Sequence, residues 1–144
     1  MSIIKISVIT ITYNAENVIM RTLDSVLKQT FSNIEHIIID GASKDSTLLA
    51  EREYESRSCS ANNGHEIKII SEPDKGLYDA MNKGIGKATG NYLVFLNAGD
   101  VFPSSSTLET VADMIGDGEE LPGVLFGDTD IVDDNGNFLR HRRL

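Results

Sequence analysis

The stretch YLVFLNAGD, Tyr92–Asp100, says more about the fold than any other part of this sequence. Its first five residues, Tyr92–Leu96, are all apolar or aromatic, as in a buried strand, and a polar turn follows them. A strand that is apolar on both faces is typical of a parallel sheet covered by helices on both sides. The stretch therefore raises the question of why such a strand ends in a carboxylate, that of Asp100.

The chain before this stretch alternates between strand and helix patterns. Runs of β-branched and apolar residues predict three strands, and helical spacing of apolar residues predicts a helix after each. The strands are 4–12, 34–40 and 66–71, and the helices are 14–29, 45–55 and one that begins at Leu77 and ends at Gly90. The order β-α-β-α-β-α-β predicts an α/β fold with a Rossmann-like, mainly parallel sheet sandwiched by helices.

Several local features carry their own expectations. Asn14 is a suitable N-cap for the first helix, and the polar segment 56–65 is expected to be a surface loop. After the fourth strand, Ser105 or Ser106 caps a helix that Gly116 closes, and Asn135-Gly136 predicts a hairpin between 123–128 and 137–142. The third helix is expected to bury one stripe, made of Leu77, Met81, Ile85 and Ala88.

Composition limits the classes of function. The 144 residues carry a net charge of −9, which argues against binding to nucleic acid through a basic face, and the basic cluster 140–143 is short. A single cysteine, Cys59, excludes an internal disulfide and fits a reducing compartment. No apolar run approaches the roughly 20 residues of a membrane helix, so we expect a cytoplasmic protein that is at most peripheral to the membrane.

Polar residues follow all four predicted strands. They are Thr12–Asn14 after the first, Asp40 after the second, Glu72–Lys75 after the third, and Asn97–Asp100 after the fourth. The carboxyl ends of parallel strands meet at one edge of a sheet, and open α/β sheets bind ligands outside that edge. One such loop would be unremarkable, but four together predict a ligand site.

The residue types at this edge indicate what the ligand is. Lys75 is the one obvious cation among several acids, so a divalent cation is expected to hold any diphosphate there. Tyr13 offers a ring for stacking a base, and Asp40 can accept a hydrogen bond from a ring N–H. The glycines of 84–90 match neither a dinucleotide fingerprint nor a P-loop, so the pattern predicts a nucleotide-diphosphate site without a phosphate-binding glycine loop.

Three segments together carry a family resemblance. They are SVITITYNAE (7–16), SVLKQTFSNIEHIIIDGASKDST (25–47) and SEPDKGLYDAMNKGIGKATGNYLVFLNAGD (71–100). In order and spacing they resemble the N-terminal part of family 2 glycosyltransferases with the GT-A fold, over roughly 4–102. The variant FLNAGD is most similar to bacterial enzymes that build O-antigen, colanic acid and related polysaccharides.

The resemblance implies a role for each position at the sheet edge. The base, typically uracil, would lie against Thr12, Tyr13 and Asn14 and would bond to Asp40, with Asp45 and Lys75 nearby. The donor sugar would face Asp79, Asn82 and Asn97. The metal, Mn²⁺ or Mg²⁺, would bind to Asp100. Other roles remain open for some of them. Asp45 is equally suited to cap a helix, Lys75 to be solvated, and Asp79 with Asn82 to form a polar outer face.

The family motif also accounts for the carboxylate that ends YLVFLNAGD. The family places an acidic metal- and donor-binding motif at this turn. Here Asn97 and Gly99 stand where the motif usually has acids, which leaves Asp100 as its only carboxylate.

The implied reaction is transfer of a sugar from a nucleotide-diphospho-sugar, with a UDP-sugar favoured, to a polysaccharide or lipid-linked acceptor, with inversion. Residues 1–144 are expected to form one GT-A-type domain, with the nucleotide-sugar part in 1–102 and an incomplete acceptor-side part in 103–144. The general base is expected beyond Leu144, and Asp128 and Asp130 are weak candidates within the chain. An incomplete acceptor side would leave apolar surface that favours a homo-oligomer.

Two alternatives remain beside this interpretation. A non-catalytic α/β nucleotide- or partner-binding module, such as a receiver, needs an aspartate at the end of strand three and a lysine after strand five. Here the third strand ends in Ser71-Glu72, and no lysine follows Lys87. A nucleotidyltransferase needs a glycine-rich basic loop after strand one, and TYNAEN has neither glycine nor a basic residue.

Overall fold

The structure, a computed structural model, describes residues 4–143. The chain forms two compact units, Met1–Met114 and Ile115–Leu144. The first holds the predicted sheet, and the second holds the predicted hairpin. Among the described residues, no helix is both long and apolar enough to cross a bilayer.

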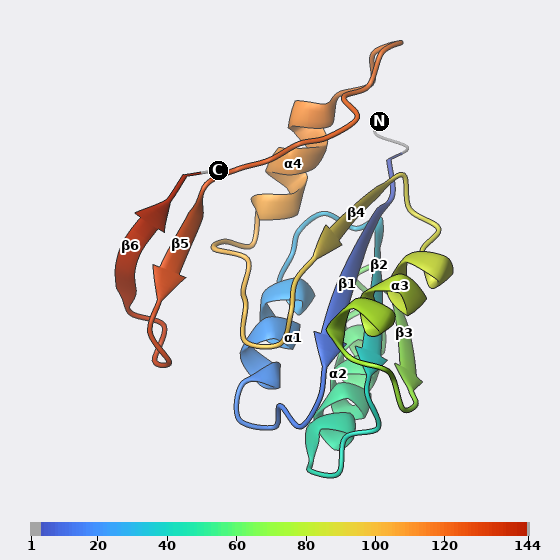
Figure 1. Ribbon diagram of the computed structural model, residues 1–144. Helices are drawn as coiled ribbons and strands as arrows, with labels where there is room; N and C mark the ends of the chain where they lie inside the picture. Colours follow the sequence, from blue (N-terminus) through green and yellow to red (C-terminus); the bar gives the residue numbers. More distant parts are fainter. Residues whose placement is uncertain (1–3, 144) are drawn as a thin grey trace. The chain divides into compact units, whose positions relative to one another are not determined.

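The first unit is built on a four-stranded parallel sheet. Its strands are β1 (Ile6–Thr12), β2 (Ile34–Asp40), β3 (Glu66–Ser71) and β4 (Tyr92–Phe95), in the order β3-β2-β1-β4. Figure 1 shows all four arrows pointing the same way. The predicted α/β fold with a mainly parallel sheet is confirmed, and Thr12 of β1 lies directly beside Asp40 of β2.

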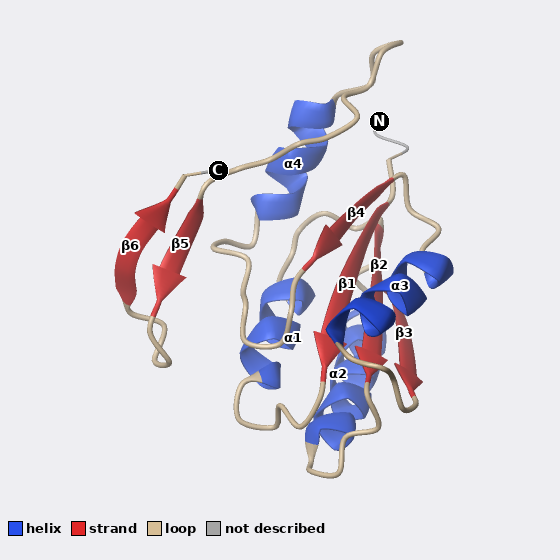
Figure 2. Cartoon of the chain, viewed as in Figure 1, coloured by secondary structure: helices blue, strands red, loops and turns tan. Residues whose placement is uncertain are grey.

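Helices cover both faces of this sheet (Figure 2). α1 (Ile19–Leu27) and α2 (Thr47–Ala61) pack on one face, and α3 (Leu77–Lys87) packs on the other. One core cluster joins Ile9, Ile37 and Ala80 of α3 with neighbouring residues, while the other joins Ile19, Ile38 and Tyr54 with theirs. Every residue of β1 and β2 is buried, as two covered faces require.

The position of β4 differs from the prediction. β4 was expected to be a buried strand, but it lies at the edge of the sheet and Leu93 is 43% exposed. The two central strands, β1 and β2, are instead the ones that contain buried polar residues. Ser7 Oγ donates to Glu35 Oε2 at 2.5 Å, and Thr10 Oγ1 lies 2.8 Å from His36 Nε2. These hydrogen bonds compensate the free-energy cost of burying polar side chains, so a strand that contains polar residues can still lie at the centre of the sheet. The apolar content of a strand therefore does not predict its position in the sheet.

The first two helices also differ from their predicted bounds. α1 begins at Ile19, so the predicted N-cap at Asn14 is wrong: Asn14 has a φ of +46°, and its side-chain oxygen accepts from Lys44 N–H at 2.8 Å. Glu16 likewise accepts from Ser46 N–H at 2.9 Å, at the start of α2. α2 continues to Ala61, so the predicted loop at 56–65 is mostly helix.

The buried stripe of α3 is shifted from the predicted one. Ala80 and Gly84 are the buried residues, whereas Leu77 and Ile85 are 49% and 46% exposed. A Cβ at Gly84 would stand 2.5 Å from Cγ2 of Ile9. The smallest side chains therefore set the helix–sheet contact, since only they let the α3 backbone approach β1 this closely.

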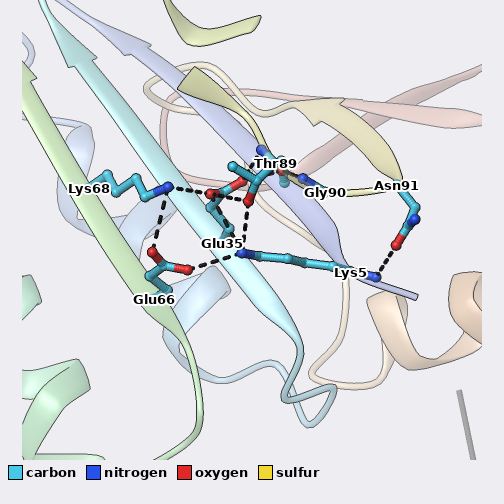
Figure 3. Close-up of polar contacts among 8 residues, drawn as sticks. Lys5, Glu35, Glu66, Lys68, Thr89, Gly90 and Asn91 are labelled. Atoms are coloured by element: carbon cyan, nitrogen blue, oxygen red, sulfur yellow. Dashed lines mark hydrogen bonds and ion pairs between the residues drawn. The ribbon is translucent and has the colours of Figure 1, made fainter. Parts of the chain in front are cut away.

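An amino-edge cluster of polar side chains closes the sheet where its strands begin (Figure 3). Its members are Lys5, Ser7, Glu35, Glu66, Lys68 and Thr89. The fully buried Glu35 accepts from Lys68 Nζ at 2.5 Å and from both the N–H and the hydroxyl of Thr89 at 2.8 Å. Burial raises the pKa of Glu35, but the hydrogen bonds from Lys68, Ser7 and Thr89 outweigh it and lower the pKa to about 2.

The second unit contains an antiparallel hairpin. α4 (Thr107–Ile115) leads into it along the chain and ends before Gly116, which has a φ of +75°. β5 (Thr129–Val132) pairs with β6 (Phe138–Arg142), and Gly136 lies in the turn with a φ of +84°. The predicted hairpin is confirmed, but the strand expected at 123–128 is wrong, since pairing begins only at Thr129. Gly123 and Gly127 lie in that stretch, and glycine disfavours a strand.

Candidate functional site

A cavity of about 370 Å³ lies at the carboxyl edge of the sheet. This is the edge where the arrows of the parallel strands end (Figure 1). Nine residues line it: Ile11, Thr12, Tyr13, Ala15, Asp74, Gly76, Leu77, Asn97 and Ala98. They come from the end of β1 and from the segments that follow β1, β3 and β4. Of the ten predicted site residues, Thr12, Tyr13 and Asn97 therefore line one cavity.

Two oxygen atoms at this cavity have no hydrogen-bond partner within the described residues. They are Oγ1 of Thr12 and Oδ1 of Asn97, and both atoms are buried. A buried polar atom without a partner costs roughly 1–3 kcal/mol. Their position in the lining is what a site needs if a polar ligand is to supply the missing hydrogen bonds.

Tyr13 gives the cavity an aromatic wall. Its side chain is 61% exposed, which is unusual for a large ring next to a buried strand. The ring lies alongside Gly41, where an added Cβ would stand 3.4 Å from Cδ2 of Tyr13. An exposed ring at the rim of a cavity can stack a planar ligand such as a nucleobase.

Asp40 lies next to this cavity without lining it. Its side chain is fully buried, and its carboxylate accepts hydrogen bonds from Ser43 N–H at 3.0 Å, from Ser71 Oγ at 2.6 Å and from the Ser43 hydroxyl. In addition, Gly41 N–H donates to Thr12 O at 2.9 Å. Asp40 thus fixes the turn that follows β2, and its predicted contact with a base stays a prediction.

Asn14 and Asp45 tie together the loops that follow β1 and β2. Asn14 N–H donates to Ser43 Oγ at 2.8 Å, and Asp45 Oδ2 accepts from Glu16 N–H at 3.2 Å. The Thr47 hydroxyl and backbone N–H also donate to Asp45, and the hydroxyl is the main cause of its lowered pKa. Both residues therefore support the rim of the cavity from outside it.

The residues predicted on or before α3 lie apart from the cavity lining. Asp79 accepts from Lys75 N–H at 2.9 Å and lies 3.7 Å from Lys83 Nζ. Lys75 and Asn82 have exposed side chains. This arrangement has the features of a polar outer face, and contact of these three residues with a ligand stays a prediction.

Asp100 ends a tight turn after β4. Its N–H donates to Asn97 O at 2.9 Å, and Gly99 holds the turn with a φ of +101°. Burial raises the pKa of Asp100, and the charge of Arg21 partly opposes this.

The metal role of Asp100 depends on what can surround it. Within residues 4–143, no three His, Cys, Asp or Glu side chains gather where they could hold a metal ion. Mg²⁺ nevertheless binds many proteins through one or two carboxylates while phosphate oxygens supply other ligands. Asp100 and the unpaired Oδ1 of Asn97 fit that kind of site, in which the diphosphate brings most of the ligands.

Sequence reasoning gave no individual role to two acids near this edge. Asp74 follows β3 and lines the cavity, and its Oδ1 accepts from Gly76 N–H at 2.9 Å. The signal was its place among the strand-end acids of SEPDKG. Glu51 of α2 is fully buried, and neither of its carboxylate oxygens has a partner within the described chain. Burial, and then the negative charge of Asp40, raises the pKa of Glu51 to about 8.

Comparison with known proteins adds independent findings. Residues 7–143 match the family described as Glycosyl transferase family 2. The chain is 37% identical over 122 residues to the PGL/p-HBAD biosynthesis glycosyltransferase of Mycobacterium tuberculosis, covering 85% of this chain and 45% of that protein. The chain thus spans less than half the length of these curated relatives.

Solved structures that are similar to this chain include two glycosyltransferases. Staphylococcus aureus TarS 1–349 in complex with UDP-GlcNAc is 28% identical, with a TM-score of 0.65 over 77% of this chain and 31% of that one. The mannosyltransferase PcManGT of Pyrobaculum calidifontis, in complex with GDP-Man and Mn²⁺, is 26% identical. Its TM-score is 0.68 over 79% of this chain and 33% of that one.

Proposed function

The chain belongs to glycosyl transferase family 2 and has the GT-A type of fold, and from this premise we propose that its carboxyl-edge cavity binds a nucleotide-diphospho-sugar. A UDP-sugar is the favoured donor, because the TarS structure holds UDP-GlcNAc. The observation that carries the proposal is the cavity itself, which joins an exposed ring, that of Tyr13, to the unpaired oxygens of Thr12 and Asn97.

The base end of the donor is assigned to Tyr13. Stacking of a base on an aromatic ring contributes about 1–3 kcal/mol and needs an exposed ring face, which Tyr13 has. Thr12 supports the same end, because its unpaired Oγ1 can hydrogen-bond to a polar group of the nucleoside. Asn14, Asp40 and Asp45 hold the loops that keep this end of the cavity in shape.

The diphosphate end is assigned to the turn after β4. Asp100 and Asn97 would hold Mn²⁺ or Mg²⁺ there together with the phosphate oxygens, and the ion would supply charge neutralisation for the departing diphosphate. PcManGT, which contains Mn²⁺, supports this assignment. Lys75, Asp79 and Asn82 remain candidates for outer contacts with the phosphates and the donor sugar.

The proposed reaction is transfer with inversion at the anomeric carbon. An acceptor hydroxyl forms the new bond to that carbon as the bond to the diphosphate oxygen breaks, and a carboxylate takes the hydroxyl proton. Neither Asp128 nor Asp130 is favoured as that base, since Asp128 is exposed and Asp130 is paired with His141. The proposed acceptor is a cell-surface polysaccharide or a lipid-linked saccharide, at the cytoplasmic face of the membrane. Self-association of this chain stays a prediction.

Titration calorimetry with UDP tests the donor site separately from transfer. We expect saturable binding of UDP that becomes tighter when Mn²⁺ is added and weaker again with EDTA. A Tyr13→Ala variant should bind UDP more weakly than the wild type, both with Mn²⁺ and with EDTA. Absence of binding heat for UDP and UDP-GlcNAc, with and without Mn²⁺, would remove the proposal.

A further inference from the structure

A row of polar side chains on and just after α1 holds the segment that follows β4. The row consists of Thr22, Ser25 and Gln29, which are three and four residues apart and therefore follow one side of the helix. Thr22 and Gln29 are buried, and Ser25 is half-buried. Gln29 Nε2 donates to Ser104 O at 2.7 Å, and its Oε1 accepts from Leu108 N–H at 3.0 Å, so this end of the row fixes the chain where α4 begins.

The other two members of the row bind the chain close to the cavity. Thr22 Oγ1 accepts from Gly99 N–H at 2.8 Å, and Ser25 Oγ accepts from Phe102 N–H at 3.2 Å. Ser25 Oγ also donates to the backbone oxygen of Thr22 at 2.8 Å, which fixes the hydroxyl on the helix. Both side chains therefore bond to the backbone of the turn after β4 and of the residues that leave it.

These bonds control where the turn that carries Asn97 and Asp100 lies. On one side, Ala98 N–H donates to a backbone oxygen of β1 at 3.3 Å. On the other side, the bond from Gly99 N–H to Thr22 joins the turn to α1. Because Gly99 lies between Asn97 and Asp100 in the chain, a movement of its backbone displaces the side chains of both.

Resting on the donor site proposed above, we propose that Thr22 and Ser25 are positioning residues for its diphosphate end. Neither residue lines the cavity. They hold the turn so that the side-chain oxygens of Asn97 and Asp100 already face the place of the metal and the diphosphate. A turn that is fixed before the ligand arrives does not have to be ordered on binding, so less of the binding free energy is lost.

A purely structural role of Thr22 predicts a different result. Loss of a buried hydrogen bond then lowers the fraction of folded protein, and the folded molecules bind UDP as before, with or without Mn²⁺. A positioning role lowers the gain in affinity that Mn²⁺ gives. UDP affinity in EDTA stays close to that of the wild type, because it depends on the base end. The ratio of the UDP affinities in Mn²⁺ and in EDTA therefore distinguishes the two roles.

The experiment measures this ratio by calorimetry for the wild type and four variants. Thr22→Val removes the hydroxyl at nearly constant size, and the few-fold tightening by Mn²⁺ should fall toward none. Thr22→Ser keeps the hydroxyl and should keep the tightening, whereas Ser25→Ala should reduce it. Thr10→Val is the matched control: Thr10 is as fully buried as Thr22 and loses its contact with His36, but the effect of Mn²⁺ should be unchanged.

Hydrogen exchange of the Gly99 amide, followed by NMR, tests the bond to Thr22 without any ligand. We expect a protected amide in the wild type and in Thr22→Ser. In Thr22→Val the amide should exchange roughly tenfold faster, as for the loss of about one hydrogen bond. The Gly90 amide, which donates to Ser7 Oγ at the other edge of the sheet, is the internal reference and should exchange alike in all variants.

The outcomes separate this proposal from the donor site itself. A wild type that does not bind UDP overturns the donor site and the positioning role together. A wild type that binds UDP equally in Mn²⁺ and EDTA overturns the metal at the diphosphate end and the positioning role, but leaves the base end in place.

Other results overturn the positioning role alone. They are a full effect of Mn²⁺ in Thr22→Val and Ser25→Ala, an equal loss of that effect in Thr10→Val, and an unchanged exchange rate of the Gly99 amide in Thr22→Val. Thermal unfolding verifies that each variant is folded. If Thr22→Val is not, the effect of Mn²⁺ in Ser25→Ala decides.

Discussion

The two ends of the parallel sheet differ in how far their buried polar groups are hydrogen-bonded. At the amino edge, Glu35 is buried and accepts hydrogen bonds from Lys68, Thr89 and Ser7, and its pKa falls to about 2. At the carboxyl edge, Thr12 and Asn97 bury oxygens without partners within residues 4–143, and burial raises the pKa of Asp100. Glu35 at the amino edge thus has its hydrogen-bond partners within the described chain, whereas the oxygens of Thr12 and Asn97 at the carboxyl edge do not.

This difference separates stability from binding. The amino-edge cluster joins β1, β2 and β3 to the segment between α3 and β4, so its hydrogen bonds hold the sheet together (Figure 3). The carboxyl edge keeps unmade hydrogen bonds that a ligand can supply. Substitutions at the first edge should therefore change the free energy of unfolding, and substitutions at the second should change affinity.

The largest expected effect is that of Glu35→Gln on stability. The Lys68 side chain is 33% exposed and keeps Glu66 at 3.5 Å. The cost therefore comes from the hydrogen bonds to the buried Glu35 carboxylate, about 1.5–3 kcal/mol for each one to a charged group. Urea unfolding at pH 7 should show this loss, while Glu66→Gln, at an exposed acid of the same cluster, should change stability by less than about 1 kcal/mol. The folded pKa of Glu35 lies below its unfolded value, so its contribution is present above about pH 4.5 and is lost as pH falls toward 2. Equal losses for both variants would contradict the account.

Glu51→Gln should have the opposite effect on stability. The folded pKa of Glu51 is raised from 4.5 to about 8, so folding keeps a proton that the unfolded chain releases. Stability from this residue is therefore fully present below about pH 4.5 and declines as pH rises to about 8. The free energy of unfolding of Glu51→Gln should exceed that of the wild type by on the order of 3 kcal/mol at pH 8 and should differ little from it at pH 4. Unfolding curves at both pH values decide this, and a pH-independent difference would count against it.

Tyr13→Ala should change affinity and leave stability nearly unchanged. Loss of one stacked base costs about 1–3 kcal/mol, which is roughly a tenfold or greater loss of UDP affinity. The melting temperature should stay close to that of the wild type, because the ring is 61% exposed. Tyr78→Ala is the control, since Tyr78 is 79% exposed on α3 and lies outside the cavity lining. If both variants bind UDP like the wild type, Tyr13 has no stacking role.

Asp100→Asn should have the smallest effect, a loss of UDP affinity only when metal is present. We expect Mn²⁺ to tighten UDP binding a few-fold in the wild type and not in the variant, because a single carboxylate contributes to the metal site. In EDTA the variant should bind UDP no more weakly than the wild type, because it lacks the carboxylate that repels the diphosphate when no metal is bound. The exposed Asp113→Asn on α4 serves as control, and an undiminished effect of Mn²⁺ in Asp100→Asn would remove Asp100 from the metal site.

Sequence patterns predicted much of this architecture. The strand runs are long and rich in β-branched residues, so the predicted strands of the parallel sheet lie within two residues of the observed ones. Parallel pairing then brings the strand ends together, and Thr12, Tyr13 and Asn97 line one cavity as expected. These features follow from local pattern and chain direction alone.

The features that the sequence did not reveal depend on contacts between distant segments. Asn14 fits an N-cap locally, but its side chain bonds to Lys44 in another loop. Gly84 packs on Ile9 because of its small size, which apolar spacing does not register. Asp74 stands out only when its carboxylate is seen beside Gly41. In each case the partner lies at least 29 residues away along the chain.

The contrast between the two edges can be measured directly with backbone amide NMR spectra recorded during UDP titration. The account predicts shifts for amides of the loops after β1, β3 and β4, including Tyr13, Gly76 and Ala98, and unchanged signals for Thr89, Gly90 and Asn91 at the amino edge. Shifts centred on the amino edge, or a spectrum that saturating UDP leaves unchanged, would contradict the claim that the carboxyl edge is the nucleotide site.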